Sequence, residues 1–380
     1  MPSSAPSSFP VLLFASTERS ADALYFGGVE VPDAFIAFGY GSQRIAVLSR
    51  LEIARVRKEG CFDTCLSLEE CQEAVKQNGG MGTPVEVVAL IAEEWAIEGF
   101  EIGYDFPAGL ANQLIGAGVT LRVVEGALFP EREIKADIEA DAIREGNAAS
   151  AAGFKVVEKA LRRATIGRGK KLYLDDKLLT SERLRQMIDI ACLERSAVAN
   201  GTIVAGGDQA CDPHCRGTGP LRADEFIIVD IFPRVTRTGY HGDMTRTYLK
   251  GQASKEQKSL YAAVFDAQQA AIKEVKAGKS GTKIYKGVCA SFEGKGYATE
   301  VVDGTPVGFF HGLGHGLGLE VHEAPRVGAV KSRLKKGQVI TVEPGLYYPG
   351  LGGVRVEDVV RVTSGEPEML SKHPYRWHIK

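Results

Sequence analysis

Four acidic residues in the second half of the chain lie within or at the end of β-rich apolar runs: Asp230, Asp243, Glu343 and Glu357. The segment "EFIIVDIFPRVTRTGYHGDMTRTYLKG" predicts a β-hairpin whose polar turn contains Gly239. If the hairpin folds symmetrically about residues 236–237, its two aspartates lie opposite each other, where Cβ atoms are ~4.5–5.5 Å apart and like charges repel. Because a bare carboxylate is costly among apolar residues, the fold of this chain must bring positive charge to these acids.

Two sources of positive charge fit the sequence. Ion pairs are the first: one aspartate caps the turn while the other pairs with Arg234 or Arg246, Glu357 forms a cross-strand salt bridge with an arginine, and Glu343 stays at a solvated strand end. A divalent cation between the two aspartates is the second, and it would remove both the repulsion and the desolvation cost. Each acid alone is compatible with an ion pair, whereas the four together favour a metal.

The stretch "FFHGLGHGLGLEVHEAP" places His311, His315 and His322 within twelve residues, among closely spaced glycines. Glycine is costly in a regular element, and imidazole is a common metal ligand and acid–base group, so the stretch predicts a site that another group must approach. Four carboxylates with one histidine make an oxygen-rich donor set, which favours Mn²⁺, with Co²⁺, Zn²⁺ or Fe²⁺ as alternatives. Four carboxylates are too many for one small cation, so we predict two ions ~3.5–4 Å apart.

The pattern of elements predicts two domains, residues 1–128 and 129–380, with a boundary in "GALFPERE". The first domain alternates short β-rich runs with helical patterns and is predicted to be a small α/β unit. The second is predicted to be α+β, a curved antiparallel sheet backed by helices. Its longest helix begins in "EIKADIEADAIREG", with Ile134, Ile138 and Ala142 stacked on one face, and Val157, Leu161 and Ala164 continue the same pattern. We predict further helices over about 180–196 and 254–278, and strands over 226–232, 243–249, 339–343 and 354–363.

Composition argues against several partners. The 380 residues include 46 basic and 48 acidic side chains, a net charge of −2, and no Lys/Arg block stands out, so we expect neither nucleic acid nor a membrane as a partner. The N-terminus lacks the features of a signal peptide, and no run reaches the ~20 apolar residues of a transmembrane helix. The seven cysteines are an odd number without export signals, so we expect reduced thiols in a cytoplasmic protein.

Two other metal-site patterns can be weighed. Cys211 and Cys215 flank His214 in "CDPHCRG", which raises the alternative of a zinc knuckle. A structural Zn²⁺ site takes four nitrogen or sulfur ligands, and no second pair stands nearby, so bystander thiols are the favoured interpretation. His322 begins an H-E-x-x-H pattern, but Arg326 occupies the last position, which excludes a zincin.

Five short motifs occur in an order and at spacings that identify a family: "DPHCRG", "VDIF…GYHGDMTRT", "HGLGHGLGLEVHE", "TVEPGLY" and "GGVRVEDVV". Over roughly residues 133–363 the chain resembles the pita-bread metallopeptidases, which include Xaa-Pro dipeptidase (prolidase), aminopeptidase P and methionine aminopeptidase. The N-terminal unit resembles the creatinase-type α/β domain that precedes the catalytic domain in prolidases and aminopeptidase P. The resemblance implies a pita-bread (creatinase/aminopeptidase) fold in residues 129–380, and a homodimer.

The resemblance also implies a dinuclear metal site with five ligands. Asp243 and Glu357 would bridge both ions, while Asp230 would bind one of them. His315 and Glu343 would bind the other, and Glu343 would also carry a proton to the leaving nitrogen. The two aspartates are thirteen positions apart, two more than the family usually shows. We interpret this as a longer hairpin turn that keeps both side chains on one side of the sheet.

Further residues would act around the metal site. Three histidines would contact the substrate and stabilise the tetrahedral intermediate: His214, His311 and His322. Arg326 stands where prolidases hold an arginine that pairs with the C-terminal carboxylate of a dipeptide, and a surface arginine is the alternative. Arg355 would lie outside the ligand set and orient a ligand carboxylate such as that of Asp230.

The activity that the resemblance implies is hydrolysis of the bond between an N-terminal residue and proline, in a dipeptide or a short peptide. A dedicated site is expected, because the X-Pro amide has no N–H for a strand-binding protease to hold. Two alternatives stay open: a methionine aminopeptidase-like enzyme, which usually lacks the N-terminal domain, and a metal-free relative, either creatinase-like or a binding module. Phe232 departs from the family pattern, since a glycine is usual at its position.

Overall fold

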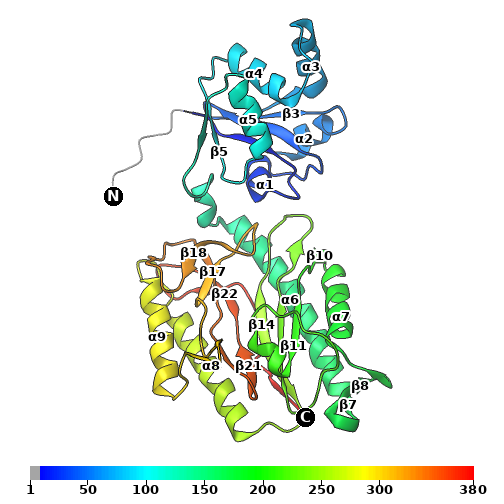
Figure 1. Cartoon of the computed structure of the whole chain (residues 1–380), viewed down its shortest axis with the longest axis vertical. Coiled ribbons are helices and arrows are strands. Elements are labelled where there is room, and N and C mark those ends of the chain that lie inside the picture. The colour runs from blue at the N-terminus through cyan, green and yellow to red at the C-terminus, as the bar shows by residue number, and fades with distance from the viewer. Residues whose placement is uncertain (1–8) are drawn as a thin grey trace. The chain divides into compact units, whose positions relative to one another are not determined.

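The computed structural model describes residues 9–380 and divides the chain into two units, Met1–Arg132 and Glu133–Lys380 (Figure 1). This division lies four residues beyond the one predicted between residues 128 and 129. Within the described residues, no helix is both long enough and apolar enough to cross a membrane.

The first unit is built on a four-stranded sheet in the order β1-β2-β3-β4, with β3 and β4 parallel and the other neighbours antiparallel. A parallel pair, β5-β6, extends the α/β pattern. Helix α4 begins with a capping box between Thr83 and Glu86 and with proline at its first position. The elements are β1 (Leu12–Ala15), α1 (Ala21–Gly27), β2 (Phe35–Tyr40), β3 (Gln43–Leu48), α2 (Ile53–Glu59), β4 (Thr64–Ser67), α3 (Leu68–Gln77), α4 (Pro84–Glu94), β5 (Phe100–Ile102), α5 (Ala108–Gly116) and β6 (Leu121–Val123).

The second unit holds two larger sheets and a two-stranded ribbon, all antiparallel except for the pair β14-β24. The first sheet consists of β11 (Ile203–Gly206), β12 (Phe226–Ile231), β14 (Met244–Lys250) and β24 (His378–Ile379). The second consists of β18 (Glu323–Val327), β17 (Gly314–Gly316), β19 (Val339–Val342), β22 (Asp358–Arg361) and β23 (Glu368–Met369). The ribbon is formed by β20 (Gly345–Tyr348) and β21 (Gly352–Arg355).

Figure 1 shows these strands between two pairs of helices, α6 with α7 and α8 with α9. The long helices are α6 (Asp137–Arg163), α7 (Ser181–Leu193), α8 (Lys255–Glu274) and α9 (Gly281–Gly294). One apolar core joins α8 and α9 to the second sheet and the ribbon, and another joins α6 and α7 to the first sheet. The short strands are β7 (Thr165–Ile166), β8 (Leu172–Leu174), β9 (Lys177–Leu178), β10 (Ala197–Val198), β13 (Arg234–Val235), β15 (Glu300–Val302) and β16 (Thr305–Val307). The strands predicted over 226–232, 243–249 and 339–343 and the helix predicted over 180–196 are present, and α8 ends four residues before the predicted end at 278.

The buried face of α6 differs from the prediction in its first half, whereas Val157, Leu161 and Ala164 are buried as predicted. Ile134 precedes the helix and Ile138 is 80% exposed, so of the three stacked residues only Ala142 is buried. Gly146 lies so close to Gly242 that an added Cβ would stand 2.3 Å from the Gly242 nitrogen. Small and polar residues therefore form the closest contact of this helix, and a pattern of large apolar residues does not reveal them. The buried residues of the helix are Ala140, Ala142, Ile143, Gly146, Asn147, Ala149, Ser150, Gly153, Phe154, Val157, Glu158, Ala160 and Leu161.

The strand predicted over 354–363 is two strands. β21 ends at Arg355 and pairs with β20, whereas β22 begins at Asp358 and pairs with β19. Between them, the Glu357 N–H donates to the Thr245 carbonyl at 3.1 Å. The chain leaves one strand partner for another at this point, so Glu357 lies at a junction of three strands and not within a regular one.

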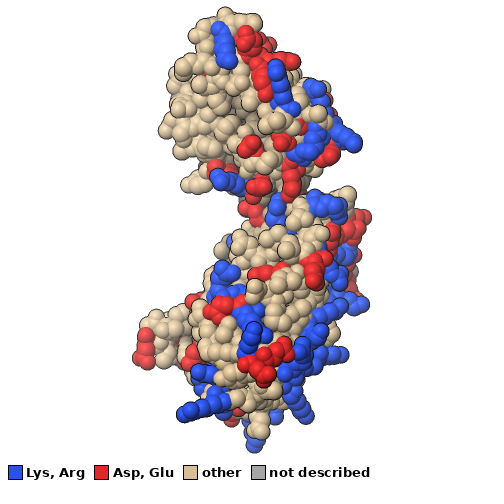
Figure 2. All heavy atoms as spheres, turned by 90° about the vertical axis from the view of Figure 1, so that its right-hand side faces the viewer, with Lys and Arg blue, Asp and Glu red and all other residues tan. Residues whose placement is uncertain are grey.

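Charged side chains of the second unit occur in two settings, mixed with opposite charges on the surface and buried where strands meet. Figure 2 shows Lys and Arg beside Asp and Glu over much of the visible surface of the second unit. Exposed ion pairs such as Lys279–Glu274 contribute little to stability. Several buried charges lie instead where the strands of the second unit meet, and these include four of the five predicted metal ligands, Asp230, Asp243, His315 and Glu357.

Candidate metal centre

All ten predicted site residues line one pocket of about 950 Å³ in the second unit: His214, Asp230, Asp243, His311, His315, His322, Arg326, Glu343, Arg355 and Glu357. Apolar side chains complete the wall, among them Ile203, Phe232 and Phe310. The Phe232 ring lies against Gly201, where an added Cβ would be 2.9 Å from the ring. The larger residue in place of the usual glycine is therefore accommodated by a glycine on a neighbouring segment.

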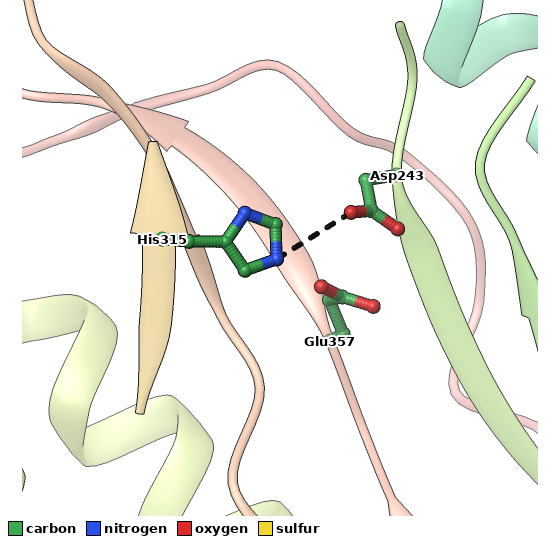
Figure 3. Close-up of side chains that lie close together, drawn as sticks. All are labelled: Asp243, His315 and Glu357. Atoms are coloured by element: carbon green, nitrogen blue, oxygen red, sulfur yellow. Dashed lines mark ion pairs between the residues drawn. The ribbon is translucent and has the colours of Figure 1, made fainter. Parts of the chain in front are cut away.

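Three residues form the centre of the site. His315 lies on β17, Asp243 directly precedes β14, and Glu357 lies between β21 and β22 (Figure 3). Each offers one ligand atom, and these atoms all lie within 4.8 Å of one another. His315 Nε2 is 3.7 Å from Asp243 Oδ2, the contact drawn in Figure 3. Three elements distant in sequence thus bring an imidazole and two carboxylates to one point.

Glu343 and Asp230 extend this centre. Glu343 Oε1 lies 3.3 Å from His315 Nε2. The side chain of Glu343 is only 18% exposed, so the alternative of a solvated strand end is wrong. Asp230, on β12, accepts a hydrogen bond from Arg355 Nη2 at 2.7 Å on Oδ2, the contact expected for this arginine. Its other oxygen, Oδ1, is buried and has no hydrogen-bond partner among residues 9–380.

The two aspartates are not directly opposed, which corrects the predicted register. Asp230 pairs with Thr245 and Ile231 with Met244, so the hairpin is centred one position later than predicted. By the same register, Asp243 lies opposite Phe232. It is two residues before Thr245, the partner of Asp230. Because a shift of two residues preserves the side on which a side chain points, both carboxylates still face the pocket.

The carboxylates of this cluster oppose each other's ionisation. Burial and the charge of Glu357 raise the pKa of Asp243 well above its usual range. Burial and the charge of Glu343 do the same for the pKa of Glu357. For Glu343, burial is outweighed by the hydrogen bond and charge of His315, which lower its pKa to about 2. Arg355 and one imidazole compensate only part of this negative charge, so the donor set fits a multivalent cation.

The unpartnered oxygen is a second indication of a ligand. A buried carboxylate oxygen without a hydrogen-bond donor is costly. Asp230 Oδ1 nevertheless has no donor among the described residues, although it lies beside the other acids. Burial raises the pKa of Asp230 even though Arg355 opposes the shift. A bound cation would satisfy this oxygen, so the residues present fit divalent metal.

Two residues that the sequence analysis missed connect the site. Thr245 Oγ1 donates to Glu357 Oε2 at 2.7 Å and accepts from Arg355 Nε at 3.2 Å. Tyr347 Oη is 2.9 Å from His311 Nε2 and accepts from Arg355 Nη1 at 3.2 Å. Both signals are present in the motifs, since Thr245 alternates with Asp243 on its strand and Tyr347 ends "TVEPGLY". Polar residues without charge are common in strands, which is why neither stood out.

His311 is held in one tautomer by its neighbours. Its Nδ1 lies 2.8 Å from the Gly312 carbonyl, an acceptor only, so Nδ1 carries the proton. The Tyr347 hydroxyl then donates to Nε2. Burial is the main cause that lowers the pKa of His311, which favours this neutral form.

Three of the predicted site residues remain: His214 and His322 lie on loops, and Arg326 lies on β18. His214 is exposed, and its N–H donates to Asp212 Oδ1 at 3.0 Å. The ring of His322 lies 4.4 Å from that of His315, perpendicular to it, and burial with the neighbouring imidazole lowers the pKa of His322 to about 4. Arg326 is exposed and pairs with His315 in register, and no carboxylate in the described part of the chain forms an ion pair with it.

The contacts of the described residues bear on two alternative interpretations of the sequence. Arg246 does not pair with either aspartate, because its Nη2 donates to Asp358 Oδ1 at 2.9 Å on the other side of the strand. Cys211 and Cys215 are free thiols. Over residues 9–380 the one cluster of histidine, cysteine and acidic ligand atoms contains neither of them, which leaves no support for a zinc knuckle.

Comparison with known proteins places the chain in context. The model of metallopeptidase family M24 matches residues 141–364. The Xaa-Pro dipeptidase of Pyrococcus furiosus is 34% identical over 175 residues, 45% of this chain and 47% of that protein. The Xaa-Pro dipeptidase of Pyrococcus horikoshii is 35% identical over 176 residues, 45% of this chain and 46% of that protein. The matched segment thus spans about half the length of these curated relatives.

Solved structures resemble the whole chain. An X-Pro aminopeptidase from Thermotoga maritima has a TM-score of 0.81 at 22% identity, covering 98% of this chain and 97% of that one. The prolidase from Pyrococcus furiosus has a TM-score of 0.76 at 22% identity, covering 96% of each chain. These likenesses confirm the predicted fold, a pita-bread α+β unit preceded by a smaller α/β unit.

Proposed function

The chain belongs to metallopeptidase family M24, and on that premise we propose that it is a dinuclear-metal-dependent Xaa-Pro peptidase of the prolidase or aminopeptidase P type. The observation that carries the proposal is the convergence of four carboxylates and one imidazole in a pocket where a buried oxygen, Asp230 Oδ1, has no partner among the described residues. Specificity for proline is supported by the similarity to the two Pyrococcus proteins named Xaa-Pro dipeptidase.

Five side chains would hold the metal: Asp230, Asp243, His315, Glu343 and Glu357. Their oxygen-rich chemistry favours Mn²⁺ over Co²⁺, Zn²⁺ or Fe²⁺, and their number favours two ions. When bound, such ions supply a water that is deprotonated near neutral pH and a Lewis acid for the scissile carbonyl. Thr245 and Arg355 would orient Glu357 and Asp230 through the hydrogen bonds that they donate.

The chain's own groups would manage the protons and the developing charge. Glu343 borders the pocket with a low pKa, caused chiefly by His315 against the effect of burial, so in the metal-free protein it is an ionised proton acceptor. We expect it to pass a proton to the leaving proline nitrogen. His322 stands beside His315 and would donate to the oxyanion. His311 is fixed by Tyr347, so its placement would help to hold the substrate.

Arg326 would select the length of the substrate. It borders the pocket without an ion pair in the described part of the chain, so its guanidinium can bind a carboxylate. A dipeptide ending in proline presents its C-terminal carboxylate next to the scissile bond, whereas a tripeptide presents it one residue further away. His214, at the same pocket, would contact the substrate backbone.

The test is hydrolysis of Ala-Pro against Ala-Pro-Ala by the Mn²⁺-loaded protein, with Arg326→Ala in parallel. If the arginine binds the free terminus, the variant should lose roughly tenfold or more of kcat/KM on the dipeptide, because a charge-assisted contact contributes ~1.5–3 kcal/mol. The loss on the tripeptide should be smaller. Arg333→Ala is the matched control, since that arginine donates to the Gly278 carbonyl outside the pocket. Equal losses on both peptides would reject the role of Arg326.

The same assay separates the alternatives. Cleavage of Met-Ala but not Ala-Pro would indicate a methionine aminopeptidase-like enzyme. Protein that binds no divalent metal and gains no hydrolysis with Mn²⁺ would indicate a metal-free relative. The homodimer and the cytoplasmic location expected from the sequence stay predictions, and light scattering of the purified protein tests the first.

A further inference from the structure

The loop that joins β17 to β18 carries the pocket residue His322, and β18 itself carries Arg326. Regular pairing between these strands is interrupted, because His315 pairs with Arg326 while the next residue, Gly316, pairs with Glu323. A bulge of this kind leaves residues outside the ladder of hydrogen bonds. Strand pairing alone therefore does not fix the position of the loop.

Glu323 closes this loop on itself. Its Oε1 accepts the N–H of Glu320 at 3.1 Å. The carboxylate also lies against Gly318, where an added Cβ would be 2.6 Å from Oε2. His322 directly precedes Glu323. The contacts that hold the Glu323 carboxylate therefore also help to hold the backbone from which the His322 imidazole extends.

Lys135 holds the Glu323 carboxylate from outside the loop. Its Nζ donates to Oε2 at 2.8 Å, and only 1% and 6% of the two side chains are exposed. The Lys135 backbone is itself fixed, because its N–H donates to the Gly337 carbonyl at 2.9 Å and its carbonyl accepts from Arg361 Nη2 at 2.8 Å. The ion pair thus connects the loop to Lys135, a residue 188 positions earlier in the chain whose backbone is held by hydrogen bonds.

Burial makes this pair different from others in the same unit. When one partner of a buried pair is removed, the other is left as an uncompensated charge that water cannot reach. We expect the Glu323 carboxylate to move towards solvent in that case and to displace His322 with it. The pair Lys335–Glu133 has the same chemistry, but Lys335 is 63% exposed, and the Glu133 side chain is 18% exposed and keeps a second donor without Lys335, Gln338 Nε2 at 2.6 Å.

From these contacts we propose that Lys135 is a positioning residue for the loop 317–326, a role in substrate binding that rests on the proposed function. It acts through Glu323 and touches no substrate. Lys135 also lies outside residues 141–364, which match the family model, and outside all five sequence motifs.

The experiment compares Lys135→Met with the control Lys335→Met and with Lys135→Arg, all loaded with Mn²⁺. Hydrogen exchange of peptides that cover 317–327 should be faster in Lys135→Met and unchanged in the control. The kcat/KM for Ala-Pro should fall between about tenfold and 100-fold, since a misplacement of ~1 Å can cost 10²-fold. The dissociation constant for Mn²⁺, measured by calorimetry, should stay near the wild-type value because the metal ligands are untouched. Lys135→Arg keeps the charge and should restore both readouts.

Several results would overturn the proposal. These are a Lys135→Met protein that exchanges and cleaves like Lys335→Met, a faster loop with unchanged kcat/KM, and a Lys135→Arg protein as impaired as Lys135→Met. If Lys135→Met does not fold, Glu323→Gln removes the charge while keeping an acceptor, with Glu133→Gln as its control, and the same outcomes apply. A wild-type protein that cleaves neither Ala-Pro nor Ala-Pro-Ala would reject the proposed function, whereas hydrogen exchange would still test the anchor.

Discussion

Glu357 and Asp358 are neighbours in sequence and are both buried, but their surroundings differ completely. Glu357 faces the pocket, where its nearest charged groups are other carboxylates and one arginine. Asp358 faces the opposite side and is fully satisfied. Its carboxylate accepts hydrogen bonds from four side chains, Arg246, Gln268, Ser371 and Tyr375, at 2.7–2.9 Å.

The difference separates two uses of a buried acid. The Asp358 cluster supplies its own cation, so it holds the structure together without a ligand. The pocket cluster, made of Asp230, Asp243, Glu343 and Glu357, has too few cations of its own and leaves Asp230 Oδ1 without a partner within the described residues. Buried groups are ordinarily satisfied, so the exception indicates where the protein is built to bind something.

The largest expected effect is at the pocket cluster. Asp243→Asn keeps the size of the side chain but removes a proposed metal ligand, so kcat/KM should fall roughly 10³-fold or more, because a bound metal contributes several kcal/mol to transition-state stabilisation. Mn²⁺ binding, measured by calorimetry, should be lost. The metal-free variant should unfold at the same temperature as wild type or higher, since less like charge is buried. A large loss of stability in EDTA would mean that this acid is structural.

The second largest effect is at the Asp358 cluster and has the opposite character. Arg246→Met leaves Asp358 as a buried charge without its cation, which should lower the free energy of unfolding by about 3–5 kcal/mol. Urea unfolding of the metal-free protein measures this change. The double variant with Asp358→Leu should recover much of the loss, because both charges are then absent. Failure of the second substitution to restore stability would show that Arg246 acts mainly through the carbonyls of Thr245 and Glu357, to which it also donates.

The sequence predicts the pocket cluster better than the Asp358 cluster, for a physical reason. Metal ligands need defined chemistry at defined positions, so Asp230, Asp243 and His315 stand out as charged or imidazole groups in apolar or glycine-rich runs. Asp358 has equally demanding surroundings, but its partners come from β14, α8 and the C-terminal segment and share no pattern with it. A pair of residues distant in sequence leaves no periodic signal.

Element types were predicted well and close contacts were not. Alternation and capping signals such as Ser254 with Gln257 mark the start of α8 correctly. The apolar pattern located Val157 and Leu161 on the buried face of α6 but not its closest contact, which uses Gly146 and Asn147 and carries no apolar signal. The hairpin register was wrong by one position at its centre because turn geometry, which symmetry alone cannot supply, sets the pairing of Asp230.

A third effect tests the comparison through metal addition. Mn²⁺ at 100 times its dissociation constant should raise the free energy of unfolding of the wild-type protein by about 2.7 kcal/mol, because it binds only the folded state. Calorimetric unfolding with and without Mn²⁺ measures the rise. It should vanish in Asp243→Asn and persist in a variant of the Asp358 cluster such as Tyr375→Phe. An equal rise in all three proteins would mean that the ion binds elsewhere.

The smallest effect compares one Tyr→Phe substitution at the Asp358 cluster with one beside the pocket cluster. Tyr375→Phe removes a donor to Asp358, a contact of 2.9 Å, and should lower the free energy of unfolding by about 1.5 kcal/mol with kcat/KM unchanged. Tyr347→Phe removes the hydroxyl between His311 and Arg355 and should lower kcat/KM about tenfold, as loss of a group that orients ligands does. Urea unfolding and Ala-Pro hydrolysis separate the two. Both substitutions remove one tyrosine hydroxyl, so a different outcome would come from the surroundings of that hydroxyl. Two variants with the same changes in stability and activity would contradict the distinction between the two clusters.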